Sequence, residues 1–128
     1  MDVALGRSDF GPTSRALLEW CQQTPQMAVV AWHTISNLFY LLHAACSDSF
    51  ARAFVGDLLE FMDVIAGGRT QVRQALQLEI KDFEDALQVA AALTAGVEII
   101  VTRNRRDYRA SPIPALAPVA FLRRFASQ

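Results

Sequence analysis

The sequence predicts an α/β fold with a short parallel sheet, and three observations support this prediction. Short apolar runs, such as Met27–Ala31 and Val97–Val101, alternate with longer stretches of helical periodicity. Apolar and polar residues do not alternate within these runs, which is typical of strands buried on both faces of a parallel sheet. Several elements end at glycine or proline, as at Thr24-Pro25, Gly67-Gly68 and Gly96, and such residues commonly stop a helix or a strand.

Length and composition indicate a single domain, residues 1–128, with a real hydrophobic core. Of the 128 residues 52% are hydrophobic, which argues against disorder. No apolar run reaches the roughly 18 residues that a membrane span needs, and no charged-then-apolar leader opens the chain. Cys21 and Cys46 lack metal-site spacing and lie among apolar residues. We therefore expect buried thiols in a cytoplasmic protein without a membrane partner.

The first part of the chain is expected to open irregularly and then form a helix, a strand and two more helices. Met1–Phe10 shows no strand pattern, and the loop Gly11-Pro12-Thr13 leads into a helix that ends at Thr24-Pro25. After the strand Met27–Ala31, Thr34 or Ser36 caps a second helix, and Ser47 or Ser49 begins a third. The aromatic residues at core spacing are expected to pack inside: Phe39, Tyr40, Phe50, Phe54 and Phe61.

The second part of the chain is expected to continue the alternation of strands and helices. Asp63–Ala66 is a brief strand and Thr70–Leu78 a short helix. A longer helix begins at Asp82, ends at Gly96 and leads into the strand Val97–Val101. The chain closes with an edge strand within Ser111–Leu116, where prolines remove ladder donors, and with an amphipathic helix over Pro118–Phe125.

Asp82 and Asp85 stand at the start of the long helix and, being three residues apart, share one of its faces. One interpretation is structural: Asp82 caps the helix, and Asp85 completes a first turn that resembles a capping box. The other is a carboxylate cluster that holds a hard cation such as Mg²⁺ through oxygen ligands. The two are compatible, because one acid can cap the helix while the next points into a cleft.

Asp107 follows the strand Val97–Val101, at the sheet edge where parallel α/β units carry their chemistry. It is either a solvated loop acid or, across a cleft from Asp85, a second cation ligand. Thr102 and Asn104, just after the strand, are suited to bind a phosphate, to orient a water or to close a turn.

Arginines dominate the end of the chain, although the formal net charge is only −1. Arg103, Arg105 and Arg106 lie in the loop after the strand. They either form a solvated basic loop or contact the backbone of a nucleic acid. His33 and His43, in contrast, match no helical ligand pair and are interpreted as local hydrogen-bonding groups. No Gly-x-Ser-x-Gly motif of a hydrolase occurs.

Taken together, several motifs resemble the PIN domain: DFEDALQVAAAL, the glycine after it, the apolar strand, TRNRRDY, SPIP and the helix that begins at Pro118. The similarity extends over nearly the whole chain, including HTISNLFYLL at His33–Leu42, and points to bacterial proteins of the VapC toxin type. It implies a three-layer α/β/α sandwich with a short parallel sheet. It also implies cleavage of RNA by acids that bind Mg²⁺ (or Mn²⁺), an antitoxin protein as partner, and a homodimer.

Position by position, the resemblance makes Asp85 the acid at the start of the long helix and Asp107 the acid after Thr-Arg-Asn. Thr102 and Asn104 correspond to the polar pair that lines the metal pocket, and Asp82 is an additional acid.

Two departures from the family pattern reduce the expected set of ligands. The family opens with an apolar strand that ends in Asp-Thr-Asn, whereas this chain opens with Met1–Arg7. The first, central strand and its aspartate are therefore expected to be missing, with Asp2 matching a later acid and the genuine start lying upstream. Asn37 stands where the family's toxins usually carry glutamate.

The sequence therefore predicts a metal-dependent ribonuclease of the PIN type, impaired by the missing acid. In it, Asp85, Asp107 and Asp82 hold the metal, and Thr102 and Asn104 complete the catalytic site. A catalytically inactive PIN-like module that binds RNA or a protein partner is the alternative.

Overall fold

The computed structural model describes residues 2–10 and 14–126, with the side chains of Arg7 and Ser8 excepted. This part of the chain forms six α-helices and a five-stranded parallel sheet, which confirms the predicted α/β class. The predicted loop Gly11-Pro12-Thr13 lies outside the described residues. The strands are β1 (Val3–Leu5), β2 (Ala28–Ala31), β3 (Met62–Ile65), β4 (Ile99–Val101) and β5 (Ala115–Leu116).

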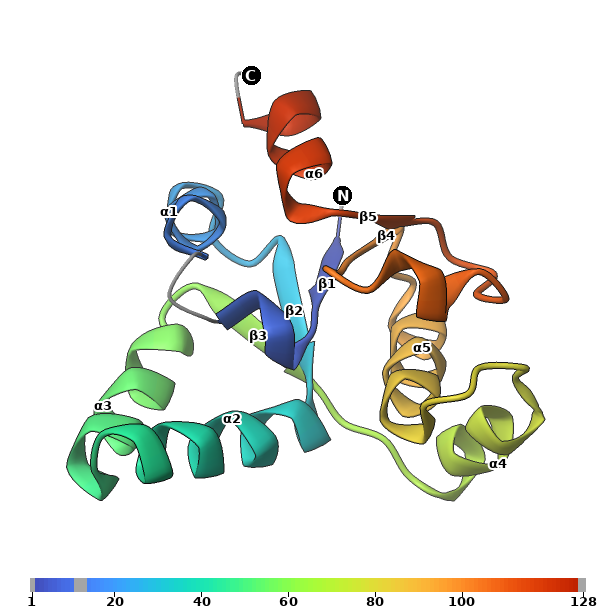
Figure 1. The fold of residues 1–128 in the computed structure, drawn as a ribbon, viewed down its shortest axis with the longest axis horizontal. Coiled ribbons are helices and arrows are strands. Elements are labelled where there is room, and N and C mark those ends of the chain that lie inside the picture. Colours follow the sequence, from blue (N-terminus) through green and yellow to red (C-terminus); the bar gives the residue numbers. More distant parts are fainter. Residues whose placement is uncertain (1, 11–13, 127–128) are drawn as a thin grey trace.

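The sheet has the order β3-β2-β1-β4-β5, with β1 in the middle (Figure 1). β1 pairs in parallel with β2 on one side and with β4 on the other. The short strand β5 lies at one edge, as the prolines around it predicted. All five strands point the same way, so their carboxyl ends meet at one edge of the sheet.

The expectation that the first, central strand is missing is wrong, because Val3–Leu5 is that strand. Its side chains are at most 2% exposed, and the Val3 amide donates to the Met27 carbonyl oxygen at 2.8 Å. Three residues are too few for a periodic pattern to appear, and the strand is defined by pairing with two distant strands. Asp2 precedes β1 and is exposed, so it is not an acid that follows the strand.

Helices cover both faces of the sheet and complete three layers (Figure 1). Successive residues of a strand point to opposite faces: Val3 and Leu5 belong to one core cluster and Ala4 to the other. The first cluster lies under α1 (Arg15–Gln23), α2 (Trp32–Ala45), α3 (Asp48–Leu58) and α6 (Pro118–Phe125). The second lies under α4 (Arg69–Gln77) and α5 (Phe83–Ala95). Two short 3-10 helices, η1 (Arg7–Phe10) and η2 (Arg105–Tyr108), follow β1 and β4.

Of the three helix caps predicted from the sequence, two are confirmed and one is wrong. The Ser47 hydroxyl accepts from the Phe50 amide at 3.1 Å and caps α3, and Asp82 caps α5. Gly96 ends α5 in the left-handed conformation, with φ of 73°, which glycine adopts without strain. α2, however, continues directly from β2 without a side-chain cap, so neither Thr34 nor Ser36 begins it.

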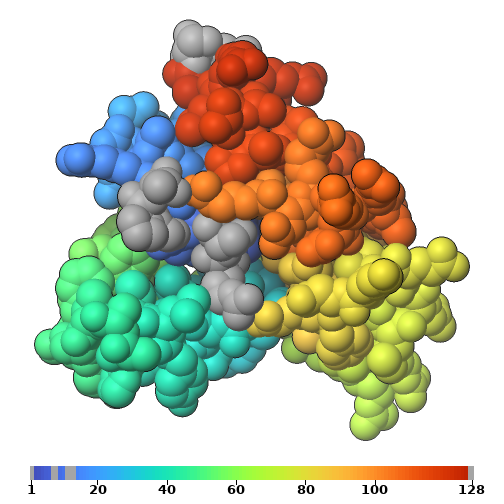
Figure 2. Space-filling view, viewed as in Figure 1, coloured from blue at the N-terminus to red at the C-terminus, as the bar shows by residue number. Residues whose placement is uncertain are grey.

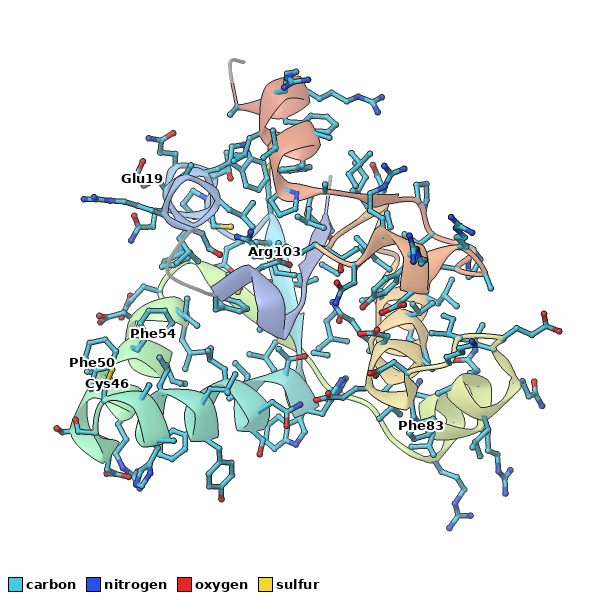
Figure 3. All side chains as sticks on the ribbon, viewed as in Figure 1. Glu19, Cys46, Phe50, Phe54, Phe83 and Arg103 are labelled. Atoms are coloured by element: carbon cyan, nitrogen blue, oxygen red, sulfur yellow. The ribbon has the colours of Figure 1, made fainter. Side chains whose placement is uncertain are left out.

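Some side chains that were expected inside lie at the surface. Tyr40 is 69% exposed and Phe50 is 48% exposed, and Cys46 is exposed while Cys21 is buried. Phe50, Phe54 and Cys46 lie together around the start of α3 (Figure 3). None of the described helices is long and apolar enough to cross a bilayer.

The exposed face of α2 contributes to an apolar groove of about 510 Å³. The groove also involves α3 and β3, and Trp32 at its side is 71% exposed. Figure 2 shows α2 and α3, in teal and green, as one lobe of the surface, with α5 and α4, in yellow, as another. Side chains that line the groove include Ile35, Phe39, Val55 and Leu59.

Candidate active site

A polar cleft of about 80 Å³ lies beyond the carboxyl ends of the central strands. Gly6 follows β1, His33 and Thr34 open α2 after β2, and Thr102 follows β4. The first turns of α5 and the helix η2 complete the wall. This is the edge at which open parallel sheets bind ligands. The loop after β4, in orange, and the start of α5, in yellow, lie side by side on the face shown in Figure 2.

The cleft brings together the five predicted catalytic and metal-binding residues. Asp85 and Asp107, distant in the sequence, both line it, and so do Asp82, Thr102 and Asn104. Two aspartates far apart in the sequence therefore line one cleft. Their roles in binding a metal stay predictions.

Asp82 performs the structural task that its position suggested. Its Oδ1 atom accepts a hydrogen bond from the Asp85 amide at 3.0 Å, which caps α5. An acid at a helix N-terminus also interacts favourably with the helix dipole. The cap fixes the first turn of α5 and, with it, the backbone from which the Asp85 side chain leaves.

Asp85 is the more buried of the two central aspartates, and its carboxylate is held by one partner. The Tyr108 hydroxyl donates to Asp85 Oδ1 at 2.9 Å. Burial raises the pKa of Asp85, the hydrogen bond from Tyr108 lowers it, and the negative charges of Asp82, Asp107 and Glu84 raise it further. The cleft is therefore a place where negative charge accumulates and where a cation would be stabilised.

Asp107 and its neighbours lie on the opposite wall, in the loop that contains η2. Asp107 and Asn104 are exposed at the mouth of the cleft, whereas Thr102 is 4% exposed. The Thr102 hydroxyl oxygen accepts from the Asn104 amide at 3.1 Å, so Thr102 closes the turn after β4. This is one of the three tasks that the sequence left open for it.

The three arginines of this loop have different surroundings. Arg103 Nη2 donates to Ser14 Oγ at 3.0 Å, and Arg103 lies in the middle of the molecule near η1 (Figure 3). Arg105 and Arg106 are exposed on η2. Contact with a nucleic acid stays a prediction for all three.

The two histidines take part in local contacts. The His33 Nε2 atom lies 3.2 Å from the Glu84 carbonyl oxygen and joins α2 to the start of α5. His43 Nε2 lies 3.9 Å from Asp48 Oδ1, at the surface. Within residues 2–10 and 14–126, no group of three or more His, Cys, Asp or Glu side chains is arranged to hold a metal ion.

Sequence reasoning missed three residues near the cleft: Tyr108, Gln88 and Asp9. Tyr108 follows the predicted acid Asp107 directly, and Gln88 lies one turn after Asp85, but their contacts depend on how η2 packs against α5. Asp9 is 0% exposed, and its Oδ2 atom accepts from the Gly6 amide at 2.9 Å. Burial raises the pKa of Asp9 to about 7, although the hydrogen bond from Gly6 and the charge of Arg103 lower it.

Comparison with known proteins decides the family. The family model of the PIN domain matches residues 1–106. The chain belongs to the PIN domain family. No curated protein sequence matches it.

Solved structures of similar fold include PIN toxins. The structure of PAE2754 from Pyrobaculum aerophilum has a TM-score of 0.76 at 15% identity, and the alignment covers 100% of this chain and 97% of the PAE2754 chain. DNA-bound VapBC from Salmonella typhimurium has a TM-score of 0.73 at 14% identity, covering 92% and 98%. VapC20 from Mycobacterium tuberculosis, a toxin that cleaves the Sarcin–Ricin loop, has a TM-score of 0.61 at 15% identity, covering 77% and 87%. At these identities the likeness concerns the fold.

The position after β1 contributes no acid to the cleft, whose acids Asp82, Glu84, Asp85 and Asp107 come from α5, η2 and the residue before α5. Gly6 occupies this position, followed by Arg7 and Ser8, whereas the family pattern given above has Asp-Thr-Asn at the end of the first strand. The strand is present and the acid is not. Asn37, at the other departure, lies on α2 one turn beyond His33.

Proposed function

We propose that this PIN domain is a metal-dependent endoribonuclease with reduced turnover, which hydrolyses phosphodiester bonds in RNA. The observation that supports this function best is the placement of Asp85 and Asp107 in one cleft at the carboxyl edge of the sheet. Membership of the PIN family supports a nuclease of this class. The chain would act as a single domain in the cytoplasm, where its free thiols Cys21 and Cys46 stay reduced.

The donors in the cleft fit Mg²⁺ or Mn²⁺ in chemistry. Both ions prefer oxygen ligands, and carboxylates supply them here. The mutual repulsion of Asp82, Asp85 and Asp107 contributes to the raised pKa of Asp85. A divalent ion would relieve that repulsion, lower the pKa of a bound water and shield charge on the phosphate. We propose Asp85 and Asp107 as its carboxylate ligands, with Asp82 as a further one.

The other residues of the cleft have distinct proposed roles. Thr102 fixes the turn after β4 and so positions Asn104 at the mouth, where its amide is suited to contact the RNA. Arg105 and Arg106 are exposed beside it and suited to bind phosphates of the backbone. Arg103, engaged with Ser14, would act mainly through its charge.

A second candidate function is a PIN module that binds RNA or a protein without cleavage. The substitution at Gly6 favours it, because the position after β1 contributes no carboxylate to the cleft. With two main ligands the ion is held chiefly by water, and its affinity is expected to be low.

We further propose that an antitoxin protein covers the apolar groove between α2 and α3. Trp32 and Tyr40 there are 71% and 69% exposed, and large exposed apolar patches mark interaction surfaces. Solved relatives are toxin–antitoxin complexes, such as one from Klebsiella pneumoniae. A homodimer is a separate proposal, and size-exclusion chromatography with light scattering of the chain alone tests it.

The proposed activity is tested by incubating the purified chain with RNA at rising Mn²⁺ or Mg²⁺. Cleavage that requires the ion and disappears in Asp85→Asn and Asp107→Asn supports the ribonuclease. Intact RNA, together with RNA binding that weakens steeply as salt rises, supports the inactive module instead.

A further inference from the structure

Gln88 is a buried polar side chain in the wall of the cleft. It lies on α5 three residues after Asp85, so the two side chains share a face of the helix. Gln88 is only 5% exposed, and its Nε2 atom has no hydrogen-bond partner among the described residues. A buried polar atom without a partner destabilises the fold, so the orientation of this amide needs a physical explanation.

The Gln88 side chain occupies the space beside Gly6. A Cβ atom placed on Gly6 would lie 3.0 Å from Gln88 Oε1 and 3.4 Å from Nε2. The contact with Oε1 is tighter than an ordinary one, so the end of the Gln88 side chain would have to shift by a few tenths of an ångström. Its amide therefore fills the volume into which a side chain after β1 would extend. The two positions form one unit: Gly6, which follows β1 and has no side chain, and a polar side chain from α5 that occupies the space beside it.

Tyr108 connects this amide to Asp85. The Tyr108 Oη atom lies 2.9 Å from Asp85 Oδ1 and 3.2 Å from the Gln88 amide oxygen. A phenol has a single proton, and a carboxylate is the stronger acceptor, so the proton goes to Asp85. Gln88 then satisfies the phenol oxygen by donating from its amide nitrogen, which requires the amide to be turned by half a rotation. In that orientation Nε2 donates to Tyr108, Tyr108 donates to Asp85, and the amide oxygen takes the buried position in the cleft wall that has no hydrogen-bond partner among the described residues.

We propose that Gln88 supplies this amide oxygen to the cleft as a neutral ligand for the divalent ion, in the place that a side chain after β1 would take. The inference rests on the proposed metal-binding function and names a further ligand for it. Amide oxygens are ordinary ligands of hard cations. A neutral oxygen attracts a cation less than a carboxylate does. The site would therefore have three protein ligands, Asp85, Asp107 and Gln88, but a lower affinity for the divalent ion than a site with three carboxylates.

The test measures Mn²⁺ binding directly, by the loss of the free-ion signal in electron paramagnetic resonance, with no nuclease assay involved. Gln88→Met keeps the length of the side chain and removes the oxygen, and Gln88→Glu keeps an oxygen and adds a charge. Gln74→Leu, at an exposed glutamine of α4, is the matched control. We expect Gln88→Met to weaken Mn²⁺ binding about tenfold or more, Gln88→Glu to strengthen it, and the control to match the wild type.

The opposite signs of the two Gln88 variants separate ligation from general damage to the fold, because damage weakens binding in both. If both variants bind Mn²⁺ like the wild type while Asp85→Asn loses binding, this inference is wrong and the proposed function stands. Weaker binding in both also overturns it. If the wild type itself binds no Mn²⁺, the proposed metal-dependent function and this inference fall together.

Discussion

The aspartates on the two sides of the cleft have different surroundings. On the side of β1, Asp9 is 0% exposed, bonds to the Gly6 amide and has a pKa of about 7. On the side of α5 and η2, Asp85 and Asp107 face the cleft. The first acid serves the local fold, and the others are available to a ligand. An aspartate close to the end of β1 therefore does not by itself contribute to the binding cleft. The direction of its side chain decides whether it stabilises the local fold or faces a ligand.

The largest effect is expected from replacing Asp85, which faces the cleft from α5. If the proposed ribonuclease is correct, Asp85→Asn lowers Mn²⁺-dependent RNA cleavage on the order of 100-fold or more, since metal-derived stabilisation amounts to several kcal/mol. Initial rates of RNA cleavage measure the effect. Glu19→Gln, an acid on α1 away from the cleft (Figure 3), is the control and should retain full activity. Equal loss in both variants would contradict the assignment of Asp85.

Asp9, the buried acid that follows β1, is expected to make the stability of the fold depend on pH. The pKa of Asp9 is about 7 in the folded chain, against an ordinary value of 3.8. The protonated form is favoured by folding, so its stabilisation is fully present below about pH 4 and is lost as pH rises through 7. The difference is at most about 4 kcal/mol. Urea unfolding between pH 4 and 8 measures it.

Asp9→Asn is the matched variant for this titration. Asparagine retains an oxygen for the Gly6 amide and cannot ionise. We expect the free energy of unfolding to vary less with pH between 4 and 7 in Asp9→Asn than in the wild type. An unchanged pH profile would show that Asp9 is ionised in the folded chain throughout this range.

Adding an acid on the β1 side would sharpen the comparison. Gly6→Asp alone places a Cβ atom 3.0 Å from Gln88 Oε1, and such overpacking costs about 1–3 kcal/mol of stability. Gly6→Asp combined with Gln88→Ala removes the clash and adds a carboxylate. We expect the double variant to melt above the single Gly6→Asp variant and to bind Mn²⁺ more tightly than the wild type. A double variant no more stable than Gly6→Asp would refute the coupling of the two positions.

The smallest expected effects distinguish two arginines of the same loop. Arg103→Ala loses the hydrogen bond to Ser14 and should lower the free energy of unfolding by about 1 kcal/mol. Arg105→Ala, at an exposed position, should leave stability within about 0.5 kcal/mol. If Arg105 contacts a phosphate, its loss reduces the salt dependence of RNA binding by about one phosphate contact. A loss of stability in Arg105→Ala and none in Arg103→Ala would contradict these assignments.

Much of the fold could be predicted because long elements carry their own patterns. α5 has a capping acid at its start and a left-handed glycine at its end, and both are confirmed. β1 could not be found in this way, because three residues carry no period and their burial depends on strands far along the chain. The exposed Tyr40 and Phe50 were misjudged for a related reason: helical spacing alone does not tell which face of α2 or α3 is covered.

The site was predictable where residue types and strand ends sufficed. Asp85, Asp107 and Thr102 follow from parallel strands that share one edge, and the structure brings them to the same cleft. The contacts of Tyr108 and Gln88 were not predictable, because they depend on side-chain directions across two packed helices. Asp9 was missed because its burial depends on the packing of η1 against α2.

The shortness of β1 has a consequence for assembly. β2 and β4 form no hydrogen bonds with each other, because each pairs with β1 (Val3–Leu5), which lies between them. A deletion that reaches Val3 would leave two half-sheets, β3-β2 and β4-β5, with open inner edges. Each edge would then be free to recruit a strand from another molecule, so damage to three residues would make the chain prone to aggregate.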